Sequence, residues 1–134
     1  MKILICGENP LQLKMMKNEL EQEGDEVRLS WSGIDLMAHV IKFMPDVLIT
    51  EVLLPQINGF EFIDNVRKHF PKISIMVLSS LRSEHLIDFV FRLGANDFVF
   101  KPFDPETLRG RILKLQESKN SLLTLNYMDY VTSV

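Results

Sequence analysis

Five short apolar runs, separated by longer amphipathic segments, constrain the fold of this chain more than any other feature. The runs are KILIC (2–6), EVRLS (26–30), DVLIT (46–50), ISIMVLS (73–79) and DFVF (97–100). DVLIT is apolar without alternation, as expected of a strand that is covered on both faces. Strands that alternate with helices pair in parallel through right-handed crossovers. The pattern predicts an α/β fold, a doubly wound five-stranded parallel sheet with helices on both faces and the strand order 2-1-3-4-5.

Capping residues indicate where the intervening helices begin and end. Asn9 as N-cap and Pro10 at the first helical position begin a helix to about residue 23, which Gly24 ends. Further helices are expected at about 33–43, capped by Ser32, and at about 60–69, 84–93 and 105–119. The 134 residues fit one domain. We expect that domain at 1–119, with 120–134 forming a tail or an extension of the last helix, in a helical or a strand conformation.

Composition excludes several classes of protein. A formal net charge of −3 gives no general attraction to nucleic acid or to anionic membranes. The single cysteine, Cys6, cannot form an internal disulfide and suits a reducing compartment. There is no signal-peptide pattern, and no run approaches the ~20 apolar residues of a membrane span. The sequence therefore predicts a cytoplasmic, soluble protein that binds neither nucleic acid nor a membrane.

Polar side chains follow the predicted strands at the edge where such sheets bind ligands, beyond the carboxyl ends of the strands. Gly7 and Glu8 follow the first strand and Glu51 follows the third, while Ser79 ends the fourth and Lys101 follows the fifth. The topology thus predicts that two carboxylates, a hydroxyl and an ammonium converge. The three histidines fall on different expected helices, so no metal cluster is expected.

Four segments resemble the receiver domain of bacterial two-component response regulators. They are KILICGENP, DVLITEVLLPQINGFEFI, IMVLSS and LGANDFVFKPFDPETL, and together they cover about residues 1–119. The resemblance implies a CheY-like, flavodoxin-like fold and a role in phosphorelay signal transduction. A receiver takes a phosphoryl group from a histidine kinase onto an Asp that ends its third strand. Two acidic residues after the first strand help to hold Mg²⁺, and a hydroxyl and a Lys contact the phosphoryl oxygens.

The chain matches this pattern at Ser79 and Lys101 but departs from it elsewhere. Glu51 stands at the phosphoacceptor position, Gly7 and Glu8 stand for the acidic pair, and Phe98 replaces a switch aromatic that could donate a hydrogen bond. The extra methylene of Glu moves its carboxylate outward, and a misplacement of about 1 Å can cost on the order of 10²-fold in rate. Mg²⁺ demands near-ideal octahedral oxygen geometry, so losing a carboxylate at Gly7 weakens the metal site.

The sequence therefore predicts a degenerate pseudo-receiver, a phosphorylation-independent module for signalling and protein interaction. We expect no enzymatic activity, no cofactor, and weak or absent Mg²⁺ binding. Glu51 is either a partial mimic of the phosphorylated state or a relic acid that pairs with Lys101. One alternative is an active receiver that accepts a phosphoryl group from a histidine kinase. Another is a nucleotide- or flavin-binding module, although GENPLQLK lacks a Gly-rich or hydroxyl-rich phosphate cradle.

Expected partners are a histidine kinase, a downstream effector or a second copy of the chain. In receivers the surface of the fourth helix, fifth strand and fifth helix usually serves for docking. Phe89 and Phe91 lie off the core stripe of the fourth helix, and we expect them beside Phe98 in an exposed patch, with partial burial as the alternative. The basic residues of the last helix, Arg109, Arg111, Lys114 and Lys119, are expected to form a solvated face.

Two local features can be predicted at Lys101. The segment FKPF matches the part of the receiver family in which the Lys–Pro bond is cis, so we expect a cis bond between Lys101 and Pro102. The position at Glu51 still needs a carboxylate to balance Lys101. We therefore expect an ion pair between Lys101 and Glu51, or between Lys101 and Glu8.

Overall fold

The computed structural model describes residues 1–31 and 35–118. The main sheet contains β1 (Lys2–Cys6), β2 (Glu26–Ser30), β3 (Val47–Glu51), β6 (Ser74–Ser79) and β7 (Asp97–Phe100). All of its strand pairs are parallel, and the order is β2-β1-β3-β6-β7. This confirms the predicted doubly wound sheet. The proposed cap at Ser32, Lys119 and the tail at 120–134 lie outside the described residues.

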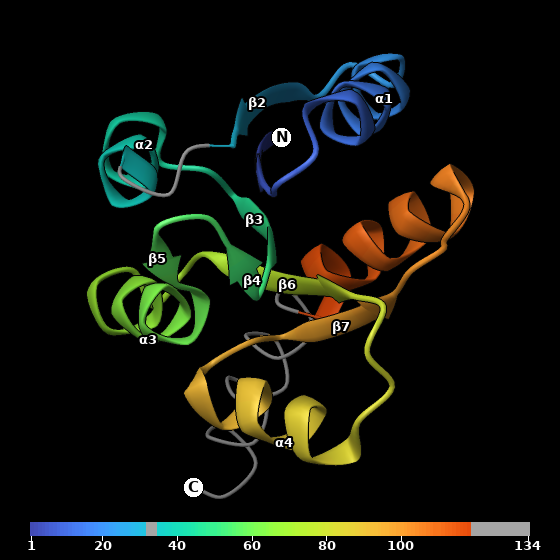
Figure 1. The fold of residues 1–134 in the computed structure, drawn as a ribbon. Helices are drawn as coiled ribbons and strands as arrows, with labels where there is room; N and C mark the ends of the chain where they lie inside the picture. Colours follow the sequence, from blue (N-terminus) through green and yellow to red (C-terminus); the bar gives the residue numbers. More distant parts are fainter. Residues whose placement is uncertain (32–34, 119–134) are drawn as a thin grey trace, which may run out of the picture.

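Helices connect the strands on both sides of the sheet (Figure 1). They are α1 (Pro10–Glu21), α2 (Leu36–Phe43), α3 (Gly59–His69), α4 (Glu84–Leu93) and a last helix at 105–118. Hydrogen bonds confirm the predicted cap at Asn9 and show that Ser83 and Asp104 cap two further helices. Asn9 Oδ1 accepts from the Leu11 amide at 3.0 Å, Ser83 Oγ accepts from the Leu86 amide at 3.2 Å, and Asp104 Oδ1 accepts from the Thr107 amide at 2.8 Å.

A short antiparallel hairpin of β4 (Leu53–Leu54) and β5 (Ile57–Asn58) was not predicted. It follows β3 directly and ends at Asn58, whose side chain caps α3 by accepting from the Phe60 amide at 2.9 Å. Gly59 is required here, because a Cβ at this position would lie 2.0 Å from the carbonyl oxygen of Val52. The hairpin therefore sets where α3 begins, beside the end of β3.

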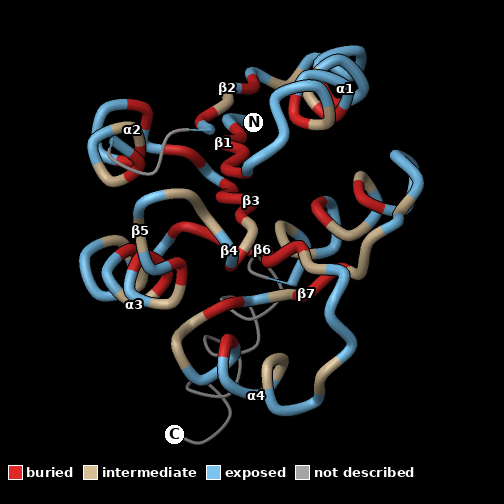
Figure 2. The backbone as a smooth tube through the Cα atoms, in the orientation of Figure 1, coloured by how far each residue is buried: buried red, intermediate tan, exposed pale blue. Residues whose placement is uncertain are grey.

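Two hydrophobic cores lie on opposite faces of the sheet. Buried side chains of α1 and the last helix pack on one face, and those of α2, α3 and α4 pack on the other. In β1, Ile3 and Ile5 point into the first core, while Leu4 and Cys6 point into the second. Figure 2 shows the central strands as an almost continuous buried band. Burial on both faces explains why these strands are apolar without alternation.

Arg67 of α3 links the ends of several elements through hydrogen bonds. Its guanidinium donates to the carbonyls of Gly94 and Pro71, both at 2.9 Å, and to Asn96 Oδ1 at 2.7 Å. Asn96 Oδ1 also accepts from the Ile75 amide at 2.8 Å. These bonds join the carboxyl ends of α3 and α4 to the start of β6. Burial lowers the pKa of the Arg67 guanidinium.

The last helix does not present its arginines as a simple solvated face. Arg111 Nε donates to Asp97 Oδ2 at 2.8 Å, and a second guanidinium nitrogen binds Asp97 Oδ1. This hydrogen bonding raises the pKa of the Arg111 guanidinium. Arg109 lies 3.6 Å from a carboxylate oxygen of Asp25. These two pairings were not predicted, because the acidic partners are distant in sequence, and the Arg109 and Arg111 side chains remain 27% and 43% exposed. Among residues 1–31 and 35–118, no helix has the length and apolar character to cross a bilayer.

Candidate functional site

A cavity of about 520 Å³ lies at the carboxyl ends of β1, β3 and β7. Its lining residues are Glu8, Asn9, Pro10, Gln12, Glu51 and Lys101. Parallel strands end at the same edge of the sheet, which is why residues so distant in sequence meet here. The predicted carboxylates and the predicted ammonium therefore come together.

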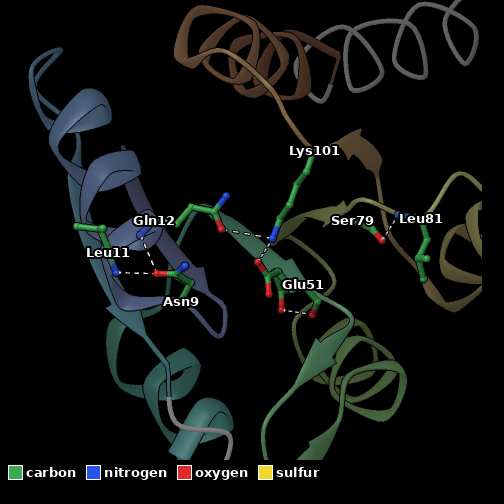
Figure 3. Close-up of polar contacts among 8 residues, drawn as sticks. Asn9, Leu11, Gln12, Glu51, Ser79, Leu81 and Lys101 are labelled. Atoms are coloured by element: carbon green, nitrogen blue, oxygen red, sulfur yellow. Dashed lines mark hydrogen bonds and ion pairs between the residues drawn. The ribbon is translucent and has the colours of Figure 1, made fainter.

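Lys101 forms an ion pair with Glu51, as predicted (Figure 3). The Lys101 and Glu51 side chains are 22% and 13% exposed, so the pair is largely screened from water. Lys101 Nζ also donates to Gln12 Oε1 at 3.4 Å. The alternative partner, Glu8, lines the cavity but is exposed. The bond between Lys101 and Pro102 is cis, which confirms that prediction.

Gly7 lies directly against the carboxyl group of Glu51. A Cβ at Gly7 would approach Glu51 Cδ and Oε1 at 3.4 Å each, and Leu13 Cδ2 at 3.0 Å. The Gly7 amide donates to the Ser30 carbonyl at 3.1 Å, which holds this part of the backbone to the end of β2. The longer side chain at position 51 therefore extends to the place where the first strand lacks a side chain.

Ser79 ends β6 but does not direct its hydroxyl to Glu51 or Lys101. Its Oγ accepts from the Leu81 amide at 3.1 Å, and Figure 3 shows the hydroxyl turned toward Leu81. Of the residues predicted at this edge, Gly7, Glu8, Glu51 and Lys101 are brought together, while Ser79 is engaged within its own loop.

Phe98 is 6% exposed and lies in the core shared with α2, α3 and α4. The expectation that it would join an exposed patch was wrong, because the alternation of β7 points this side chain under α4. Phe89 and Phe91 are 46% and 41% exposed, as expected. The ring of Phe89 packs edge-on against Phe60 of α3 at 5.0 Å, so its aromatic neighbour is on α3 and not on β7.

Two contacts around the site were missed by sequence reasoning. Gln12 reaches Lys101 from the first turn of α1, and the cap at Asn9 could have indicated this because helical side chains point back toward the N-terminus. The Arg82 guanidinium lies 4.3 Å from the ring centre of Phe100, next to Lys101. Nothing in the local sequence indicates this second contact, which joins the loop after β6 to β7.

The receiver family implies Mg²⁺, and the donor set of this cavity does not suit that ion. Mg²⁺ takes oxygen ligands in octahedral geometry. Here Gly7 supplies no side-chain oxygen, and the carboxylate of Glu51 is bound to an ammonium. In the described parts of the chain, no group of three or more His, Cys, Asp or Glu side chains could hold a metal ion. Glu8 is left as the carboxylate of the cavity that is not engaged by Lys101.

Comparisons with known proteins agree with the fold. The sequence profile of the response regulator receiver domain matches residues 3–113. The chain is 28% identical over 116 residues to the DNA-binding dual master transcriptional regulator RpaA of Synechocystis, covering 85% of this chain and 48% of that protein. It is 28% identical over 125 residues to response regulator SaeR of Staphylococcus aureus, covering 91% and 50%. The chain thus spans about half the length of the curated relatives it matches.

Solved structures show the same similarity. A putative response regulator from Chloroflexus aurantiacus superposes with a TM-score of 0.75 at 33% identity, covering 83% of this chain and 93% of that one. A CheY-like receiver domain from Methanospirillum hungatei gives a TM-score of 0.84 at 22% identity, covering 90% and 96%, which bears on the fold alone. With its five-stranded sheet and the profile match over 3–113, the chain belongs to the response regulator receiver domain family.

Proposed function

We propose that this chain is an atypical receiver, a signalling module that acts by protein contact and does not itself accept a phosphoryl group. The observation that carries the proposal is the ion pair between Glu51 and Lys101. Phosphoryl transfer depends on the positioning of the acceptor and on charge neutralisation around it. At the acceptor position, the Glu51 side chain is longer than that of Asp, and its carboxylate is already paired with the Lys101 ammonium.

The same pair supports a role for Glu51 as a built-in, partial substitute for a phosphoryl group. In receivers the Lys after the last strand contacts phosphoryl oxygens, and here Lys101 contacts a carboxylate oxygen of the chain. The substitution is partial because Ser79, the other expected phosphate contact, keeps its hydrogen bond to Leu81. We further propose that Mg²⁺ binds weakly or not at all, because Gly7 supplies no carboxylate and the carboxylate of Glu51 is paired with Lys101.

Exposed apolar residues suggest where partners dock. On α1, Leu11 and Met15 are 69% and 62% exposed. Met15 lines a second cavity of about 500 Å³ between α1 and the segment after Lys101. Phe89 and Phe91 on α4 are also exposed, and the Leu113 side chain on the last helix is 44% exposed. Exposed apolar patches commonly mark protein contacts. We propose that a histidine kinase, a downstream effector or a second copy of the chain uses these surfaces.

The other features favour protein partners in a reducing compartment. Cys6 is a free, buried thiol, which suits the cytoplasm, and the net charge of −3 does not favour nucleic acid.

The second candidate function is phosphorylation at Glu51. It is favoured by the retained Lys101 and by the family match over 3–113.

Intact-mass measurement after incubation with acetyl phosphate and Mg²⁺ separates the two functions. We expect no increase in the mass of the wild-type chain. The control is Glu51→Ala, which removes the acceptor position. A gain of one phosphoryl group by the wild type that is lost in Glu51→Ala would establish phosphorylation and refute the proposal.

A further inference from the structure

We infer that Gly7 and Glu51 form a matched pair, in which the absence of a carboxylate at position 7 allows the Glu51 carboxylate to remain beside Lys101. Gly7 is then a positioning residue for Glu51, and not a separate loss from the metal site. This inference rests on the proposed function, since it explains how a site without phosphotransfer keeps a stable charge arrangement.

The distances at Gly7 carry the first step. A Cβ there would lie 3.4 Å from Glu51 Oε1. A carboxyl carbon lies about 1.5 Å beyond its Cβ, so in every rotamer of Asp it would fall within about 5 Å of that oxygen. Like charges at such a separation disfavour each other's ionised form. The Gly7 amide is bonded to the Ser30 carbonyl, so the backbone cannot easily withdraw.

The bulk of a side chain at position 7 matters less than its charge. The tightest contact, 3.0 Å, is with Leu13 Cδ2, a terminal methyl group of a core side chain, which has to shift by only a few tenths of an ångström. The φ angle of Gly7 is not in the left-handed region, so an L-residue can adopt its backbone conformation. An uncharged residue of the size of Asp should therefore be tolerated much better than Asp itself.

The charge balance of the cavity carries the second step. Two carboxylates, Glu8 and Glu51, and one ammonium, Lys101, line it, and Glu8 is exposed to solvent. Gln12 contributes a neutral amide. Lys101 therefore neutralises Glu51 within the cavity. A third carboxylate at position 7 would have no cation in this set to balance it.

Restoring a metal site should therefore require two substitutions together. With Glu51→Asp, the carboxylate is one methylene shorter and leaves room beside position 7. Gly7→Asp would then complete a set of three carboxylates with Glu8, which offers the oxygen ligands that Mg²⁺ prefers. Gly7→Asp alone would crowd two carboxylates beside one ammonium, and Glu51→Asp alone would still lack a ligand.

The test compares four proteins: the wild type, Gly7→Asp, Glu51→Asp and the double variant. Each is titrated with Mg²⁺ while the backbone amide signals of residues 7–9 and 51 are followed by NMR. Each is also unfolded in urea without metal. We expect the double variant to bind Mg²⁺ at least about tenfold more tightly than the other three. Gly7→Asp should destabilise the wild-type chain much more than it destabilises the Glu51→Asp variant. The two substitutions should therefore be non-additive by about fivefold or more in the unfolding constant.

Gly7→Asn is the matched control, because it adds the same bulk without the charge. It should destabilise the chain clearly less than Gly7→Asp. Equal effects of Asn and Asp, additive effects of the two Asp substitutions, or Mg²⁺ binding by Gly7→Asp as tight as by the double variant would each overturn the inference. If Gly7→Asp does not fold, a folded double variant supports the pair and an unfolded one contradicts it. Mg²⁺ binding by the wild type would count against the proposed function, whereas additivity without such binding contradicts only the matched pair.

Discussion

Lys101, which follows β7, is ion-paired with Glu51, which ends β3, although 50 residues separate them in the chain. Both side chains are mostly buried, and Gln12 of α1 also contacts the ammonium. A charge in such a place is tolerated because its partner is present. The pair thus joins three elements at the edge where receivers carry out their chemistry.

The first prediction concerns the coupling within this pair. Glu51→Gln or Lys101→Met alone should lower the free energy of unfolding by about 1–3 kcal/mol, because each leaves a mostly buried charge without its partner. The double variant should recover much of that loss. A double-mutant cycle from urea unfolding measures the coupling. Simple addition of the two effects would contradict our explanation of why a carboxylate is retained at position 51.

The second prediction concerns the contact of Gly94 with Arg67. Gly94 has φ +120°, and a Cβ there would lie 2.4 Å from Arg67 Cγ. Gly94→Ala should therefore cost about 2 kcal/mol or more, from backbone strain and displacement of the guanidinium. Gly24 is the control, since it has φ +91° but no heavy atom within 4 Å of the added Cβ. Gly24→Ala should cost only about 1 kcal/mol in the same urea experiment. Equal costs would show that Arg67 adapts freely.

The third prediction concerns the Cys6 thiol. Burial raises the pKa of this thiol far above its ordinary value of 9.0. The unfolded chain therefore loses the thiol proton before the folded chain does, so stability is complete below pH 9 and declines as the pH rises beyond it. The free energy of unfolding of wild type minus that of Cys6→Ala, measured between pH 7 and 10.5, should show this decline. A pH-independent difference would contradict a buried, protonated thiol. Cys6 in the folded protein should also react slowly with thiol reagents.

The fourth prediction separates the surface aromatics from the core aromatic. Phe98→Ala should destabilise the chain by about 3–5 kcal/mol, because this side chain is 6% exposed. Phe91→Ser should cost about 1 kcal/mol or less, because Phe91 is 41% exposed. If the α4 surface binds a second copy, Phe91→Ser should also reduce self-association in sedimentation experiments. A large loss of stability from Phe91→Ser would indicate that it belongs to the core.

The sequence by itself was sufficient for the strands of the main sheet, for the helices between them and for the strand order. The runs that became β1, β3 and β6 are apolar on both faces, and caps such as Asn9 and Ser83 act on amides only two or three residues away. Such signals are local, so they can be recognised without knowing the fold. The topology then indicated which residues meet at the carboxyl edge, and the pairing of Lys101 with Glu51 followed from charge balance.

Only the tertiary structure decided how the individual side chains are used. Phe98 is buried because β7 passes beneath α4, and Arg111 is paired because the last helix lies beside Asp97. The Ser79 hydroxyl accepts a hydrogen bond within its own loop, and the carboxyl group of Glu51 lies beside Gly7. Each of these outcomes depends on distances of a few ångströms between residues far apart in sequence. Sequence periodicity indicates which face of a helix or strand a residue occupies. It does not indicate which atoms from other parts of the chain the side chain contacts there.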